Sequence, residues 1–361
     1  MKQHRVLIGD CIESMRSLQD QSVNTCVTSP PYYGLRDYGM AGQIGLEETP
    51  AEFVARLVDV FREVRRVLRD DGTAWVNMGD SYASGGRGGG GSYMAERGDG
   101  AWAGKGSATG WRSAPAGLKH KDLMGIPWRL AFALQDDGWY LRQDIIWSKP
   151  NPMPESTRDR CTKSHEYLFL LSKSPRYYYD QDAIKEPVAL SSIRRLAQDI
   201  EQQRGSDRVP EKSNGTMKAV RSKRDSFKRD DSKREQPIPG QTLGTHRPDR
   251  EESDWPLDTR NKRSVWTVPT QGFKGAHFAT FPLDLIRPCI LAGAPLGGTV
   301  LDPFGGAGTT AVVAMQEGRK SILCELNPEY AAMAERRIAA AWLDGAAQMD
   351  VFRDTVQHPA A

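Results

Sequence analysis

A glycine-rich stretch near the C-terminus constrains the fold of this chain more than any other feature. It reads Val300-Leu301-Asp302-Pro303-Phe304-Gly305-Gly306-Ala307-Gly308-Thr309-Thr310, with the pattern of a buried strand before it and of a helix after it. Glycines in such a turn let the backbone approach a ligand closely, and N–H groups at a helix start attract negative charge. Twenty residues after Gly305, Glu325 ends the next predicted strand, where a carboxylate can accept both ribose hydroxyls of an adenosine-type cofactor. The stretch therefore predicts one half of a doubly wound α/β sheet.

Two other interpretations of this turn stay open. Glycine-rich turns also serve tight packing alone, and a nicotinamide cofactor needs similar geometry. The nicotinamide fingerprint G-x-G-x-x-G is incomplete, because Ala311 stands where the third glycine would follow Gly306 and Gly308. Alanine is tolerated at that position, so the turn alone does not decide between the cofactors.

The rest of the chain alternates between strand and helix patterns. This alternation predicts an α/β fold with a mostly parallel, doubly wound sheet. Residues 84–110 are rich in glycine and serine, which predicts a flexible connector or mobile flap. The expected strands are 5–9, 23–28, 73–78, 140–147, 166–172, 299–302 and 321–325, and the expected helices are 12–18, 50–68, 127–134, 281–291, 309–317 and 328–342.

Positive charge is concentrated between residues 194 and 234, within a polar segment that runs from about residue 180 to 265. The 194–234 stretch holds 13 Lys or Arg against 7 Asp or Glu. Composition alone fits a solvated tail and a phosphate-binding surface equally well.

Several function classes are disfavoured by composition. No apolar run approaches the roughly 20 residues that cross a bilayer, and the N-terminal run Val6-Leu7-Ile8 is too short for a secretory signal. We therefore expect a soluble, cytoplasmic protein. The five cysteines are scattered and form no C-x-x-C pair, so neither disulfides nor a metal site is expected.

The strand expected at 23–28 ends at Ser29-Pro30-Pro31-Tyr32. A proline-stiffened turn explains the prolines but neither the serine nor the tyrosine. Transfer chemistry at an amino group on a base explains all four, because its lone pair is delocalised and needs acceptors that favour a more pyramidal nitrogen. The Ser29 hydroxyl and the Pro30 carbonyl can accept, and Tyr32 can stack on an extruded base.

Three segments resemble the motifs of DNA amino-methyltransferases: Ser29-Pro30-Pro31-Tyr32, Phe304-Gly305-Gly306-Ala307-Gly308 and Glu325-Leu326-Asn327-Pro328. Their order is that of the circularly permuted beta group of this family. Further matches are Gly9-Asp10-Cys11, Trp147-Ser148-Lys149-Pro150-Asn151, His165-Glu166 and His277-Phe278-Ala279-Thr280-Phe281-Pro282. The resemblance implies a Rossmann-like S-adenosylmethionine-dependent methyltransferase that acts on a flipped-out base in double-stranded DNA.

The resemblance also implies roles for single residues. Asp10 would contact the cofactor adenine, Glu325 its ribose, and Leu326 would pack against the adenine. The methionine part of the cofactor would be surrounded by Asp302, Phe304, Thr280 and Phe281. The glycine-rich turn would complete the cofactor site with Gly305, Gly306, Gly308 and Thr309, and Ser29, Pro30, Pro31 and Tyr32 would be catalytic.

In this family the target-recognition region lies where the basic segment stands here. The resemblance therefore favours DNA contacts by the basic residues Lys149, Arg221, Lys223 and Arg224. The implied division is a catalytic half at 1–179, a recognition insert at 180–265, a cofactor half at 266–345 and a tail at 346–361. A bacterial or phage origin, a cognate restriction endonuclease, and a monomer or homodimer are further expectations.

Ser29 favours cytosine-N4 as the methylated atom, because relatives that modify adenine-N6 usually begin this motif with Asp or Asn. Adenine-N6 stays open as the alternative. Methylation of RNA or of protein glutamine, and a catalytically inactive DNA-binding protein, are less favoured because both motifs are intact beside a basic insert. Pro288-Cys289 resembles the pair that methylates cytosine carbon, but it precedes the cofactor strand, which favours an ordinary buried cysteine. His165 has no partner at metal-ligand spacing and is expected to be structural or DNA-facing.

Overall fold

The computed structural model describes residues 3–35, 37, 39–83, 86–87, 111–112, 118–191, 259–270 and 281–357. The chain divides into two compact units. One consists of Met1–Ala183 with Arg263–Ala361, and the other of Ile184–Lys262. All elements of the predicted sheet belong to the first unit.

The first unit is built on an eight-stranded sheet in the order β1-β12-β11-β2-β3-β7-β6-β10. Every neighbouring pair is parallel except those of β7, which runs antiparallel to both β3 and β6. The mostly parallel sheet expected from the sequence is confirmed. The strands are β1 (His4–Ile8), β2 (Val23–Thr28), β3 (Leu68–Met78), β6 (Tyr140–Ser148), β7 (His165–Ser172), β10 (Val265–Thr267), β11 (Thr299–Asp302) and β12 (Lys320–Glu325).

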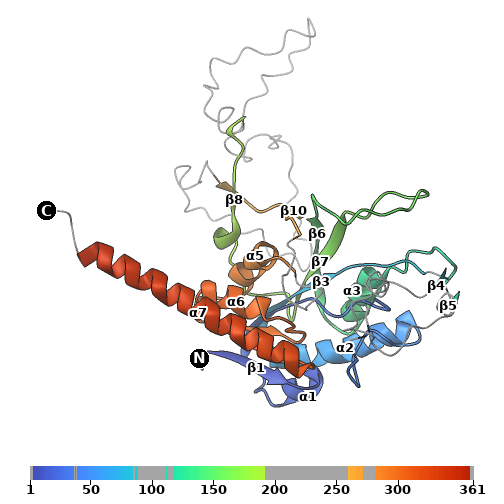
Figure 1. The fold of residues 1–361 in the computed structure, drawn as a ribbon, viewed down its shortest axis with the longest axis horizontal. Helices are drawn as coiled ribbons and strands as arrows, with labels where there is room; N and C mark the ends of the chain where they lie inside the picture. The colour runs from blue at the N-terminus through green and yellow to red at the C-terminus, as the bar shows by residue number, and fades with distance from the viewer. Residues whose placement is uncertain are drawn as a thin grey trace, which may run out of the picture. The chain divides into compact units, whose positions relative to one another are not determined.

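Two groups of helices accompany the sheet (Figure 1). In one group α2 packs against α1 and α3, and in the other α6 packs against α5 and α7. Helix α2 shows why these segments are helical: Thr49 and Glu52 form a capping box at its start, and its buried side chains share one face. The helices are α1 (Cys11–Arg16), α2 (Pro50–Val67), α3 (Ile126–Asp136), α5 (Leu283–Gly293), α6 (Thr309–Gln316) and α7 (Pro328–Gln357).

The carboxyl ends of the parallel strands meet at one edge of the sheet, which we call the carboxyl edge. From β11 the chain continues to β12 on one side, and from β2 it continues to β3 on the other. The gap between β11 and β2 is therefore a topological switch point, where open α/β sheets bind their ligands. Ser29 follows β2 and Pro303 follows β11, so the two main motifs leave the sheet on either side of this point.

Most expected element bounds agree with the structure to within one to two residues, and two differ by five residues or more. The helix expected to end at Trp342 continues to Gln357, because the following residues include no proline and one interior glycine is tolerated. The strand expected to begin at Thr73 begins at Leu68. Its register against β2 shifts between Val23 and Thr25, so the Asp71-Gly72 turn is absorbed as a bulge inside the strand.

Small ribbons lie outside the main sheet. Strand β4 (Gly86–Arg87) pairs with β5 (Trp111–Arg112), so the described ends of the glycine-rich 84–110 segment meet. In the second unit, β8 (Glu186–Pro187) pairs with β9 (Thr259–Arg260), and Arg260 donates to Glu186 at 2.9 Å. Among the helices in the described part of the chain, none is both long and apolar enough to cross a membrane.

Candidate active site

One buried hydrogen bond joins the two motifs at the switch point. The Thr28 hydroxyl, at the end of β2, donates to Asp302 Oδ1, at the end of β11, over 2.6 Å. Ser29 and Pro303 are the next residues along the two chain segments. The Ser29–Tyr32 tetrapeptide and the glycine-rich turn therefore begin beside the same contact, although 274 residues separate the two bonded partners in the chain.

Asp302 is the central hydrogen-bond acceptor of this junction. Its carboxylate also accepts from the Thr310 hydroxyl at 2.6 Å and from the Phe304 N–H at 3.1 Å. The residue is 1% exposed, and this burial raises the pKa of its carboxyl group, against the hydrogen bonds that lower it. Both oxygens are thus engaged within the protein, which makes Asp302 a positioning residue. Its expected contact with the methionine part of a cofactor stays a prediction.

Glu325 lies at the end of β12 and faces the glycine-rich turn. Its Oε2 accepts the Gly306 N–H at 2.7 Å and its Oε1 accepts the Asn327 N–H at 2.9 Å. Burial raises the pKa of this carboxyl group. Each oxygen accepts one N–H and keeps lone-pair capacity for a further donor. The carboxylate is therefore held in place and can still accept hydroxyl groups.

Asp10 lies next to Glu325 along the carboxyl edge, because the Gly9 N–H donates to the Glu325 carbonyl at 2.9 Å. The Asp10 carboxylate caps α1 by accepting the N–H groups of Ile12 and Glu13 at 2.9 and 3.1 Å. The structure thus brings together the residues predicted for the adenine and the ribose of the cofactor. Their cofactor contacts stay predictions.

Packing accounts for two of the three glycines in the turn. A Cβ on Gly305 would lie 2.8 Å from the Cβ of Leu323 on β12, and one on Gly308 would lie 2.8 Å from the Cβ of Ala334 on α7. Gly308 also has φ +80°, which favours glycine. The packing interpretation therefore holds for these two positions, and Gly306 is the one whose N–H reaches Glu325.

The other predicted cofactor residues are distributed around this turn. Phe304 packs partly buried against the core, Leu326 follows Glu325, and Phe281 precedes α5. Thr309 begins α6, and its hydroxyl accepts a hydrogen bond from Arg337 on α7 at 3.2 Å, a contact with no signal in the sequence. Thr280, Arg221, Lys223 and Arg224 lie outside the described residues.

Tyr32 is held by a polar network from β3, β6 and β7. Its hydroxyl donates to Glu166 Oε2 at 2.6 Å, and the Asn77 amide donates to the same oxygen at 3.3 Å. Lys149 pairs with the other oxygen of Glu166 and lies 4.3 Å from the centre of the Trp147 ring. Burial, followed by the neighbouring Glu166 charge, raises the pKa of the Tyr32 hydroxyl well above its ordinary value. Tyr32 therefore stays a neutral donor.

The Tyr32 ring is also fixed by its neighbour Gly79, which follows β3. A Cβ on Gly79 would lie 2.5 Å from Tyr32 Cε2, so the backbone approaches the ring where any larger residue would clash. Ser29, Pro31 and Tyr32 are half-buried, and Pro30 is buried. The tetrapeptide is therefore held in place and partly accessible.

The sequence singles out Glu166 and Lys149 separately and does not reveal that they act as a pair. The Lys149 ammonium pairs with Glu166, with 17% of its side chain exposed, and the DNA contact expected of Lys149 stays a prediction. An acidic residue at the start of a strand carries no signal of its partner. The pairing follows from the β6–β7 register, which brings Ser148 opposite His165 and so places Lys149 near Glu166.

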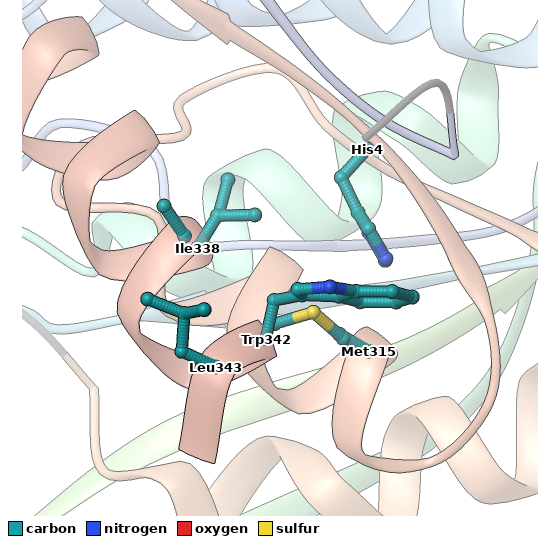
Figure 2. Close-up of a pocket in the computed structure, with 6 residues that line it drawn as sticks. His4, Met315, Ile338, Trp342 and Leu343 are labelled. Carbon is teal, nitrogen blue, oxygen red and sulfur yellow. The ribbon is translucent and has the colours of Figure 1, made fainter. Parts of the chain in front are cut away.

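Other candidate features lie elsewhere. Cys289 is fully buried within α5, and its thiol faces the Leu285 carbonyl at 3.6 Å. Within the residues that the structure places, no group of His, Cys, Asp or Glu is arranged to hold a metal ion. An apolar cavity of about 130 Å³ lies near the first residue of β1, away from the carboxyl edge, so it does not belong to this site. Figure 2 shows the cavity in close-up. Its lining is His4, Met315, Ile338, Ala339, Trp342 and Leu343.

Comparison with known proteins identifies the family. The family described as DNA methylase matches residues 23–336. The Type II methyltransferase M.SmaI of Serratia marcescens is 43% identical over 335 residues, covering 92% of this chain and 90% of that protein. M.Cfr9I of Citrobacter freundii is 44% identical over 337 residues, covering 91% of this chain and 86% of that protein.

Solved structures show the same fold at low sequence identity. The PvuII DNA methyltransferase (cytosine-N4-specific) gives a TM-score of 0.54 at 19% identity, covering 92% of this chain and 85% of that chain. A DNA modification methylase of Thermus thermophilus, complexed with S-adenosyl-L-methionine, gives a TM-score of 0.52 at 21% identity over 94% of both chains. The sequence relatives and the matched residues together show that this chain belongs to the N6/N4 DNA methylase family.

Proposed function

We propose that this chain is a site-specific DNA methyltransferase that transfers a methyl group from S-adenosylmethionine to the N4 amino group of a flipped-out cytosine. The observation that carries the proposal is the Thr28–Asp302 hydrogen bond, because it seats a base-binding tetrapeptide beside a nucleotide-binding turn. The Type II names of the relatives support a role in restriction–modification or in protection of phage DNA. Double-stranded DNA is then the partner, and the permuted motif order is part of the proposal.

The residues at the carboxyl edge fit S-adenosylmethionine. Glu325 is held by two backbone N–H groups and retains acceptor capacity for the ribose hydroxyls, and Asp10 adjoins it for the adenine. Asp302 fixes the turn on which Phe304 faces the methionine part. The bound cofactor supplies the activated methyl group, and this chain supplies its orientation.

The tetrapeptide prepares the amino group that receives the methyl. The Ser29 hydroxyl and the Pro30 carbonyl accept the two amino hydrogens, which favours a pyramidal nitrogen with an available lone pair. The two prolines restrict the backbone, so these acceptors need little reorganisation. Tyr32, fixed by Glu166 and Gly79, provides the ring on which the extruded base rests.

Cytosine is preferred over adenine because of Ser29. A hydroxyl both accepts from the amino group and donates to the neighbouring ring nitrogen. Adenine also has a ring nitrogen acceptor beside its amino group, so hydrogen bonding alone does not separate the two bases. The preference for cytosine rests mainly on the serine at the start of the motif. The PvuII DNA methyltransferase, which has a similar fold, is named as cytosine-N4-specific, in agreement with this choice.

Nucleoside analysis tests the proposed function directly. DNA from cells that express the chain should contain 4-methylcytosine by mass spectrometry, and labelled S-adenosylmethionine should transfer tritium to DNA and neither to RNA nor to protein. Finding 6-methyladenine would overturn the choice of base alone. Absence of transfer to any DNA would overturn the proposed activity.

Glu325→Ala should weaken S-adenosylmethionine binding by about 1.5–3 kcal/mol, as expected for hydrogen bonds to a charged group. The variant removes both ribose acceptors and leaves the Gly306 and Asn327 N–H groups without this partner. Calorimetry of the folded variant measures the loss. Glu335→Ala, an exposed glutamate on α7, is the control and should bind normally. Unchanged affinity in Glu325→Ala would exclude Glu325 from the cofactor site.

Replacing Arg221, Lys223 and Arg224 together by alanine should lower DNA affinity and make its salt dependence shallower. Each lost phosphate contact reduces the slope of log affinity against log salt by about 0.9. The control triple variant should leave the slope unchanged, because it removes exposed cations near the opposite edge of the sheet, at Arg16, Arg69 and Lys320. Equal slopes for both triple variants would show that the basic segment is a solvated tail.

A further inference from the structure

The loop that joins β6 to β7 extends from the same edge as the site. This β6–β7 loop runs from Lys149 to Ser164 and is closed at its base, where the Lys149 N–H donates to the Ser164 carbonyl at 2.8 Å. In Figure 1 it is the green excursion that extends away from the ends of β6 and β7. Its first residue, Lys149, and Glu166, two residues beyond its end, form the pair that holds Tyr32. The base of the loop therefore belongs to the same hydrogen-bond network that positions the Tyr32 ring.

The first arm of the loop is anchored to the segment after β10. The Asn151 side chain accepts from the Thr270 N–H at 2.9 Å and donates to the Thr270 carbonyl at 3.1 Å. The Thr270 hydroxyl donates to the Asn151 carbonyl at 3.3 Å. Three hydrogen bonds thus fix the backbone two residues before Met153.

The returning arm is anchored to the segment after β3. Arg160 pairs with Glu155 and stacks over the Tyr82 ring at 3.9 Å. The Lys163 ammonium donates to the Asp80 carbonyl at 2.5 Å. Because both arms are held, the residues between Asn151 and Glu155 are presented outward on a fixed support.

Met153 lies in this outward-facing stretch. It lies between Pro152 and Pro154, and its 84% exposure is the highest among the large apolar residues that the structure describes. A single exposed apolar residue is ordinary. Here, however, the two prolines restrict the backbone on each side, so little conformational entropy is lost when the side chain is inserted elsewhere. The thioether is unbranched and polarisable, and it adapts to irregular apolar surfaces such as stacked bases.

We propose that Met153 is a wedge that enters the DNA base stack beside the target base and stabilises the extruded state. Extrusion leaves a gap between stacked base pairs, and apolar side chains that enter such steps offset the lost stacking. Arg158 is exposed on the same loop, where a cation can face a phosphate. The inference rests on the proposed function, because it requires a base to be flipped into the site at Tyr32.

The test compares a duplex from which extrusion of the target base requires much free energy with one from which it requires little. The modified site is first located by sequencing plasmid DNA from cells that express the chain. Single-turnover methylation is then measured on short duplexes in which the target base is either correctly paired or placed opposite an abasic position. Met153→Ala should be about tenfold slower than the unmodified protein on the paired duplex and within about twofold of it on the abasic duplex. Met153→Leu, which keeps an apolar side chain of similar size, should retain most of the rate.

Leu296→Ala is the matched control. Leu296 is 78% exposed on the turn before β11, at the opposite edge of the sheet, so its loss should leave both rates unchanged. Equal slowing of Met153→Ala on the two duplexes, or no slowing on either, would overturn the wedge while the proposed function stands. Absence of methylation by the unmodified protein on both duplexes would overturn the function and the wedge together.

Discussion

Ser29→Ala is expected to lower the rate of DNA methylation by about 100-fold to 1000-fold, the range found when one preorganised polar group is removed from an active site. The hydroxyl accepts an amino hydrogen of the base in the proposed reaction, and alanine offers no replacement. Affinity for S-adenosylmethionine should be unchanged, because Ser29 is not among the residues proposed to hold the cofactor. Single-turnover rates and calorimetry measure the two quantities separately.

The matched control for this variant is Ser22→Ala. Ser22 directly precedes β2, whereas Ser29 directly follows it, so the two serines mark opposite ends of one strand. The Ser22 hydroxyl donates to the Gln19 carbonyl at 2.6 Å and has no contact with the site. Its loss should leave the methylation rate intact. A Ser29→Ala protein with the rate of the unmodified chain would remove Ser29 from the mechanism.

Asp302→Ala is expected to destabilise the fold by about 3 kcal/mol or more. The variant leaves the buried hydroxyls of Thr28 and Thr310 and the N–H of Phe304 without their hydrogen-bond acceptor. Asp302→Asn should lose less, since the amide keeps one acceptor and can donate to a threonine hydroxyl. Denaturant titration gives the free energies of unfolding. Asp144→Asn, on the exposed side of β6, is the control and should be neutral.

The pH dependence of stability distinguishes a buried carboxylate from an ordinary one. Burial raises the pKa of Asp302 in the folded state, so the native protein binds this proton at a higher pH than the unfolded chain does. The contribution of Asp302 is therefore fully present below its unfolded pKa and is lost as the pH rises through the native pKa. Asp302→Asn should remove this fall in stability, and an identical pH profile in the two proteins would contradict the assigned shift.

Local sequence patterns were enough to predict the fold class and the strand ends from which the two main motifs start. The period-2 and period-3.6 patterns depend on local burial, and they located strands such as 23–28 and 299–302 at the bounds observed. The motifs at Ser29–Tyr32 and Glu325 could be assigned to strand ends because turn chemistry is encoded by neighbouring residues. The sequence therefore predicts a strand end for each motif, and the sheet order places the two ends at one edge.

The residues that hold these motifs in place follow from the strand order and could not be predicted from local sequence. Thr28 and Asp302 meet because β2 and β11 are neighbours in the sheet, and Lys149 meets Glu166 because β6 and β7 pair in one register. Neither contact leaves a local pattern in the sequence, since the strand order places residues far apart in the chain next to each other. The same is true of Gly305 and Gly308, where β12 and α7 leave no room for a side chain. Local patterns specify elements and their ends, whereas the order and register of the strands select the partners of each buried polar group.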